Sequence, residues 1–215
     1  EQNTANFTVD KATVTLSGIS KTYDGGTTKG NTSMTISGVG SETLNFSAAT
    51  YSDANVATAN KYLTALTLAD NGSYLASNYQ LPTLNLANAA ATINKAMVSL
   101  SGISKTYDGG TSKGNTSMTI SGVGSETLSF SAATYSDANV ATANKYLTAL
   151  TLADNGSYLA SNYQLPTLNV TNAAATINKA TVTLSGISKT YDGGTTKGNT
   201  SMTISGVGSE TLSFS

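Results

Sequence analysis

The side chains of this chain that could carry out chemistry are few. The sequence contains no His and no Cys, two of the residue types that most often act as general base or activated nucleophile. A close pair of carboxylates could still perform acid–base catalysis. In residues 11–94, however, the acidic residues fall in separate predicted turns and strands: Asp24, Glu42, Asp53 and Asp70. We therefore expect no catalytic residues and no enzymatic activity.

Metal and cofactor sites are supported no better. Calcium needs about six to eight oxygen ligands, and the sequence has no Asp-x-Asp-x-Asp run, only Asp53, Asp70 and Asn71 as isolated candidates. The absence of Cys excludes thiolate metal sites and a disulfide framework. We expect no metal and no cofactor. A self-formed Lys–Asn isopeptide bond beside Glu42 stays open, because it needs only a Lys, an Asn and one acid.

A Tyr-Asp-Gly turn is the strongest candidate for a binding feature. It occurs three times, as Tyr23, Asp24 and Gly25, as Tyr107, Asp108 and Gly109, and as Tyr191, Asp192 and Gly193. A tyrosine beside a carboxylate suits sugar recognition. The sequence favours a structural role instead, in which the tyrosine covers the core and the Asp-Gly-Gly segment makes the turn.

The three turns are spaced 84 residues apart, because the whole chain repeats with that period. Residues 11–94 and 95–178 differ at six positions: Thr13/Met97, Thr15/Ser99, Thr28/Ser112, Asn45/Ser129, Leu86/Val170 and Ala87/Thr171. We predict the last strand of a preceding repeat at 1–10, repeat 1 at 11–94, repeat 2 at 95–178 and an incomplete repeat 3 at 179–215. Near-identical modules in a row favour a structural array over a single site.

The composition limits the partners. Charged residues make up 11% of the chain, every basic residue is Lys, and the net charge is −1. Nucleic-acid binding is not expected without arginine forks or a basic patch. No segment is long and apolar enough to insert into a membrane.

Short alternating segments predict an all-β fold. Polar and apolar residues alternate, with turn residues between them, in six segments: Thr13–Leu16, Met34–Ser37, Leu44–Ser47, Leu66–Leu68, Thr83–Leu86 and Ala91–Ile93. We predict about seven strands per repeat, in a small antiparallel β domain. The predicted core is Val14, Leu16, Ile36, Leu44, Phe46, Val56, Leu66, Leu68, Leu81, Leu84 and Ile93, with the equivalent residues in repeat 2.

The junction between repeats carries no flexible linker. The segment 93–98 runs from the last strand of one repeat into the first strand of the next without Gly or Pro. A flexible linker would be rich in Gly and Ser. The sequence therefore predicts a rod-like array.

Four motifs in a fixed order resemble the YDG-type repeats of bacterial filamentous-haemagglutinin-like adhesins. They are Lys21–Thr27 (KTYDGGT), Asn55–Thr58 (NVAT), Asn78–Leu81 (NYQL) and Ile93–Ala96 (INKA). The resemblance implies stalk repeats of a large Gram-negative surface or secreted protein, often exported by two-partner secretion. Related repeats have β-grasp-like folds, so both a sandwich and a β-grasp-like domain remain open.

Glycosylation sites are a further possibility. Asn-x-Ser/Thr acceptors recur at Asn31, Asn71, Asn115, Asn155 and Asn199. Chance alone produces several such acceptors in a chain so rich in Asn, Ser and Thr.

The function we expect from the sequence is that of a stalk or spacer in an extracellular or cell-surface adhesin or filament. The expected partners are neighbouring repeats of the same chain and like chains in a bundle. The alternative is that each repeat binds a glycan or matrix polymer weakly and that many copies give avidity.

Overall fold

The computed structural model describes residues 8–214 except 29, 113, 197 and 199. It divides into two compact units. Unit 1 comprises the described part of Glu1–Met97 together with Gly122–Glu126 and Ser161–Gln164; unit 2 comprises Val98–Ser121, Thr127–Ala160 and the described part of Leu165–Ser215. Strands make up 48% and helices 5%, which confirms the all-β class.

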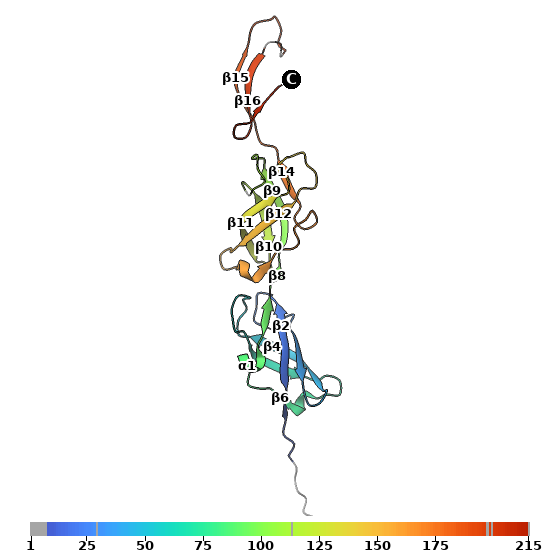
Figure 1. Ribbon diagram of the computed structural model, residues 1–215. Helices are drawn as coiled ribbons and strands as arrows, with labels where there is room; N and C mark the ends of the chain where they lie inside the picture. Colours follow the sequence, from blue (N-terminus) through green and yellow to red (C-terminus); the bar gives the residue numbers. More distant parts are fainter. Residues whose placement is uncertain (1–7, 29, 113, 197, 199, 215) are drawn as a thin grey trace, which may run out of the picture. The chain divides into compact units, whose positions relative to one another are not determined.

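A curled sheet of five strands forms the centre of unit 1 (Figure 1). Its strands, in the order β5-β4-β3-β2-β7, are β5 (Leu63–Ala69), β4 (Thr43–Tyr51), β3 (Ser33–Ser37), β2 (Thr15–Thr22) and β7 (Thr92–Asn94). The first four form an antiparallel meander, and β7 then pairs with β2 in parallel. The first two residues of β4 pair with β3 and the rest pair with β5, so the sheet bends along this strand.

Short elements complete unit 1. They are β1 (Ala12–Thr13), β6 (Tyr79–Gln80), a 3₁₀ turn (Ala76–Asn78), α1 (Leu86–Ala89) and β8 (Ala96–Met97). Strands β1 and β6 pair in parallel, as do β8 and β13 (Tyr163–Gln164). Repeat 1 thus contains seven strands, β1 to β7, as predicted. The sequence pattern did not show that β1 pairs with β6, and β2 with β7, in parallel.

Unit 2 repeats this plan. Its five-stranded sheet has the order β12-β11-β10-β9-β14, formed by β12 (Leu147–Ala153), β11 (Thr127–Tyr135), β10 (Ser117–Ser121), β9 (Ser99–Thr106) and β14 (Ala175–Asn178). A 3₁₀ turn lies at Ala160–Asn162. Beyond it, β15 (Thr183–Lys189), β16 (Thr200–Ser205) and β17 (Thr211–Leu212) form a three-stranded antiparallel sheet.

The strand predicted at Thr83–Leu86 is wrong, because α1 begins at Leu86. Asn85 caps this helix: its Oδ1 accepts hydrogen bonds from the backbone N–H groups of Ala87 and Asn88, both at 3.0 Å. In repeat 2 Asn169 makes the equivalent bonds, but the segment forms turns rather than a helix. Val170 and Thr171 replace Leu86 and Ala87 there, and both have a lower helix propensity.

The core differs from the prediction in one instructive way. Val14, Ile36, Leu44, Leu66 and Ile93 are buried as expected. The other six predicted core residues are only half-buried: Leu16, Phe46, Val56, Leu68, Leu81 and Leu84. The largest buried side chains are instead three tyrosines and two lysines, which are Tyr51, Tyr135, Tyr163, Lys21 and Lys105.

A β-bulge explains the position of Phe46. The pairing of β4 with β5 shifts between Phe46 and Ala48, so the alternation of faces changes along the strand. Leu44 is buried before the shift, whereas Ala49 and Tyr51 are buried after it. A strict period of two carried through Phe46 misses this change.

The prediction of a strand at 1–10 falls mostly outside the described residues, which begin at residue 8. Residues 8–10 lie in no strand. Residues 8–10 are equivalent to 92–94, which form β7 and pair with β2. Because β7 occupies this edge of β2, residues 8–10 cannot pair there. No helix among the described residues is long and apolar enough to span a membrane.

Candidate functional site

The Tyr-Asp-Gly turn of repeat 1 follows directly from the end of β2. Because β2 and β7 are parallel, their carboxyl ends lie at the same edge of the sheet. The N–H of Tyr23 donates to the carbonyl of Asn94 at 2.8 Å. The fold therefore places the turn beside Lys95, the single residue between β7 and the first strand of the next repeat, β8.

A buried lysine holds the turn together. The side chain of Lys21 is fully buried, and its Nζ lies 2.5 Å from Oδ1 of Asp24. The same ammonium donates to the carbonyls of Gly26 (2.9 Å) and Thr28 (3.0 Å) and lies 5.4 Å above the ring of Tyr51. All three of its protons thus have acceptors within the turn.

The turn is stiffened further by its own residues. Oδ1 of Asp24 also accepts from the N–H of Gly26 at 3.2 Å, and Gly25 has a φ of +83°, a conformation that favours glycine. Repeat 2 preserves the arrangement: Lys105 lies 2.6 Å from Asp108, donates to two carbonyls and covers the ring of Tyr135. The Asp-Gly part of the motif is therefore an internal brace.

This brace predicts acid sensitivity. The hydrogen bond from Lys105 lowers the pKa of Asp108 below its ordinary value of 3.8. The folded state thus binds fewer protons than the unfolded state, so the pair stabilises the fold above that pH and loses its effect as the pH falls below it. We expect the stability difference between wild type and Asp108→Asn to shrink as the pH falls below about 3.8, measured by urea unfolding. A difference that stayed constant between neutral pH and about pH 2 would contradict the brace.

The tyrosine of the turn contacts the following repeat. Within unit 1, the hydroxyl of Tyr23 donates to Glu126, at 3.0 Å from Oε1 and 3.3 Å from Oε2. Its ring meets the ring of Tyr163 edge-on, with centroids 5.3 Å apart. Burial, followed by the hydrogen bond to Glu126, raises the pKa of Tyr23. Within unit 2, Tyr107 repeats the bond by donating to Oε1 of Glu210 at 2.6 Å.

An asparagine makes a second connection within unit 1. Asn162 is 1% exposed, and its Oδ1 accepts from the N–H of Val56 at 2.8 Å. Its Nδ2 donates to Oδ1 of Asn55 at 2.9 Å. Lys61 binds the same loop, since its buried ammonium donates to the carbonyls of Val56 and Thr58. The NVAT motif of one repeat therefore binds the Ser-Asn-Tyr-Gln motif of the next.

Exposure of the three turn tyrosines follows these contacts. Tyr23, which contacts both Glu126 and Tyr163, is 8% exposed. Tyr107, for which a bond to Glu210 is formed, is half-buried. Tyr191 is 92% exposed. Tyr23, the most buried of the three, is thus the one that contacts two residues of the following repeat.

The remaining carboxylates are not brought together. Asp53 accepts from Asn55 N (2.6 Å) and Thr58 Oγ1 (2.8 Å), and the backbone bond is the main cause that lowers its pKa. Asp70 accepts a hydrogen bond from the N–H of Ala76 at 2.8 Å, and Glu42 accepts a hydrogen bond from the hydroxyl of Tyr79. Within the described part of the chain, no group of three or more His, Cys, Asp or Glu residues could hold a metal ion.

The asparagines of the glycosylation motifs are used in local structure. Nδ2 of Asn71, the atom that glycosylation would modify, donates to Oγ1 of Thr43 at 3.0 Å, and Asn155 makes the same bond to Thr127. Asn31 and Asn115 accept from the N–H groups of Thr22 and Thr106, at 2.9 and 2.8 Å. Asn199 lies outside the described residues.

Sequence reasoning missed the roles of Lys21, Glu126 and Asn162. Each lies in or beside a recurring motif, so the repeat marked the segments without assigning their contacts. Identical copies conceal whether a motif contacts its own repeat or the next one, because both choices fit the same pattern. A buried lysine carries no sequence signal that distinguishes it from an exposed one.

The described geometry defines a tandem-repeat protein of small β domains, in which a Tyr-Asp-Gly turn ends the first long strand and binds the following copy. A comparison with protein families matches the YDG domain twice, at residues 6–86 and 89–174. These matches cover most of the chain, which therefore belongs to the YDG domain family. No curated protein and no solved structure matches it.

Proposed function

We propose that these YDG domains are stalk or spacer repeats of a large bacterial surface or secreted adhesin or extracellular filament. The observation that carries the proposal is the set of contacts that the turn makes. The ion pair of Lys21 and Asp24 holds the turn in shape, and the hydroxyl of Tyr23 donates a hydrogen bond to Glu126 of the next repeat. A turn built to recognise a ligand would keep its tyrosine accessible. In repeat 1, Tyr23 is 8% exposed and contacts Glu126 and Tyr163 of the following repeat.

The cellular setting extends the same proposal. The order of the four sequence motifs supports a filamentous-haemagglutinin-like adhesin of the outer surface of a Gram-negative bacterium, exported by two-partner secretion. The repeats would extend the protein away from the cell, with neighbouring repeats and like chains as partners and with no enzymatic role. Near-identity between copies supports uniform geometry rather than a specialised site in one copy.

Binding measurements can separate this function from the rival one, weak glycan or matrix binding multiplied by copy number. The 215-residue chain would be displayed multivalently against glycan and matrix-polymer arrays, together with Tyr191→Ala. Tyr191 is almost fully exposed, so this variant removes a turn tyrosine without a folding defect. We expect no binding from either protein. Binding that Tyr191→Ala abolishes would overturn the spacer function.

In the parent adhesin, deletion of one whole 84-residue repeat should shorten its reach without changing the specificity of adhesion. Atomic force microscopy of single cells measures both quantities, as rupture distance and ligand dependence. Loss of adhesion at unchanged surface expression would count against a spacer.

A further inference from the structure

The strands at the beginning of repeat 1 are paired with segments that come late in the same repeat, and these pairings are parallel. Strand β1 pairs with β6, and β2 pairs with β7. The intervening strands β3, β4 and β5 make only antiparallel pairs. The chain thus enters the repeat along β1 and β2 and leaves it along β7, which is hydrogen-bonded directly to β2.

Tension along the chain would load β2 and β7 in opposite directions. Lys11 precedes β1 at the start of the repeat, and Lys95 follows β7 at its end. Because β2 and β7 run in the same direction, force at Lys11 draws β2 toward its own beginning, whereas force at Lys95 draws β7 toward its own end. The force therefore acts along the strands, and all the hydrogen bonds between them share it. Strands that are pulled apart from one end would instead lose their bonds one at a time.

The pairing of β2 with β7 continues to the end of both strands. The register places residues 20–22 opposite residues 92–94 without a shift. Beyond it, the N–H of Tyr23 donates to the carbonyl of Asn94 at 2.8 Å. The side chain of Ile93, in the middle of β7, is buried. Sliding of β2 along β7 would break these contacts together.

The beginning of the repeat is held by a second parallel pair, β1 with β6. The N–H of Val14, directly after β1, adds a bond to the carbonyl of Gln80 at 3.0 Å. Strand β6 is itself anchored by Tyr79, whose side chain is buried. The hydroxyl of Tyr79 donates to Glu42 and accepts from the N–H of Val39 at 3.1 Å. Both ends of the first strand segment are thus attached to the rest of the repeat.

The side chain of Lys21 adds a further obstacle to sliding of β2. It is fully buried, and its ammonium binds Asp24 and the carbonyls of two other turn residues. The turn is tied to β4, because the carbonyl of Thr27 accepts from the N–H of Tyr51 at 2.7 Å. Strand β2 can therefore move toward its beginning only if the buried ammonium leaves its acceptors or the turn leaves β4.

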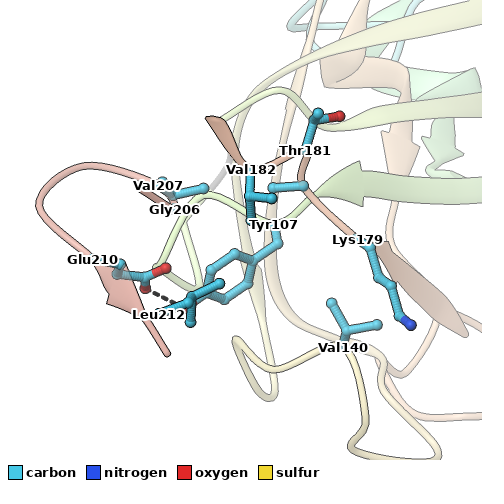
Figure 2. Close-up of a pocket in the computed structure, with 10 residues that line it drawn as sticks. Tyr107, Val140, Lys179, Thr181, Val182, Gly206, Val207, Glu210 and Leu212 are labelled. Carbon is cyan, nitrogen blue, oxygen red and sulfur yellow. Dashed lines mark hydrogen bonds between the residues drawn. The ribbon is translucent and has the colours of Figure 1, made fainter. Parts of the chain in front are cut away.

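Unit 2 contains the same arrangement. Strand β14 pairs with β9 in parallel over the four residues Ala175–Asn178, and Lys105 is buried in the position equivalent to Lys21. Directly after β9, Figure 2 shows the phenol of Tyr107 directed toward the carboxylate of Glu210, to which it donates at 2.6 Å. This bond would also be strained if β9 moved toward its beginning. Two copies of the fold thus combine a parallel pair with a buried lysine at the same point.

We propose that the parallel pair of β2 and β7, together with the side chain of Lys21, forms a force-bearing clamp that keeps the repeat folded under tension. The backbone bonds of the clamp must break together, and the ammonium of Lys21 must lose acceptors that are costly to leave unpaired in a buried site. The use of the clamp to the cell rests on the proposed stalk function, whereas its resistance to force is a property of the fold.

Pulling on repeat 1 in two directions tests the clamp. The chain contains no Cys, so pairs of introduced cysteines define the points at which force is applied to the 215-residue chain. Lys11→Cys with Lys95→Cys loads β2 and β7 lengthwise, whereas Thr22→Cys with Lys95→Cys opens the same pair from one end. All three residues are exposed. We expect unfolding to be at least about tenfold slower in the lengthwise geometry than in the end-opening geometry at the same force, measured with optical tweezers.

Two lysine variants test the contribution of Lys21 in the lengthwise geometry. Lys21→Met removes a buried ammonium from the loaded strand. Lys61→Met is the matched control, since it removes a buried ammonium that binds the carbonyls of Val56 and Thr58 in the loop before β5. We expect Lys21→Met to unfold at least about tenfold faster than wild type, and Lys61→Met to change the rate by less than about threefold.

Equal unfolding rates in the two pulling geometries would overturn the clamp. They would leave the stalk function standing, because that function is tested by ligand binding and by reach. Equal acceleration by Lys21→Met and Lys61→Met would overturn the part assigned to Lys21. The comparison of geometries uses only exposed attachment points, so it decides the proposal even if a lysine variant does not fold.

Discussion

Tyr51→Ala is expected to lower the free energy of unfolding of unit 1 by about 3–5 kcal/mol, the cost of removing a large buried aromatic side chain. Tyr51 is 2% exposed at the end of β4, and its ring lies beneath the buried ammonium of Lys21. The substitution therefore removes both core volume and the support of the turn. Native-state hydrogen exchange of the β4 and β5 amides measures the effect.

The matched control for Tyr51 is Phe46, which lies on the same strand before the bulge. Phe46 is only half-buried, so Phe46→Ala should cost clearly less than Tyr51→Ala. Amides of unit 2 should keep their protection in both variants and provide an internal reference. A larger loss from Phe46→Ala than from Tyr51→Ala would mean that the faces of β4 are assigned incorrectly.

Lys21→Met should destabilise unit 1 by about 3 kcal/mol, because removing one partner of a buried charged network leaves the other groups unpaired. The carboxylate of Asp24 would lose its salt bridge, and the carbonyls of Gly26 and Thr28 would lose their donor. Methionine nearly preserves the length and volume of the side chain, so the loss reports on the charge and its hydrogen bonds.

Lys189 offers the control for Lys21, since it makes the same ion pair and the same type of carbonyl contacts with a side chain that is 22% exposed. Lys189→Met should cost much less, because water can reach the groups that it leaves behind. Urea unfolding, combined with hydrogen exchange of β2 and β15, distinguishes the two. Equal losses would show that burial does not strengthen the brace.

The sequence was sufficient to predict the all-β class, the period of 84 residues and the Asp-Gly-Gly turn. Gly25 has the positive φ that this turn requires. These features depend on local chemistry, which repeats faithfully in every copy. The predicted count of about seven strands agrees with β1 to β7 of repeat 1, although the predicted segment Thr83–Leu86 forms no strand.

The rest depended on contacts between distant residues. The parallel pairing of β7 with β2 closes a sheet over about seventy residues and leaves no local pattern. The bulge after Phe46 changed which side chains enter the core. The bonds from Tyr23 to Glu126 and from the N–H of Val56 to Asn162 join copies that are identical in sequence at these positions, so no pattern could assign them.

The central claim is that the turn tyrosine serves the following repeat, and one substitution made at three equivalent positions tests it most directly. Tyr23→Ala, Tyr107→Ala and Tyr191→Ala would be compared by urea unfolding of the 215-residue chain. We expect Tyr23→Ala to cost about 2 kcal/mol, Tyr107→Ala to cost less, and Tyr191→Ala to leave stability unchanged, in the order of their burial. Equal effects at all three positions, or no effect of Tyr23→Ala, would contradict the claim.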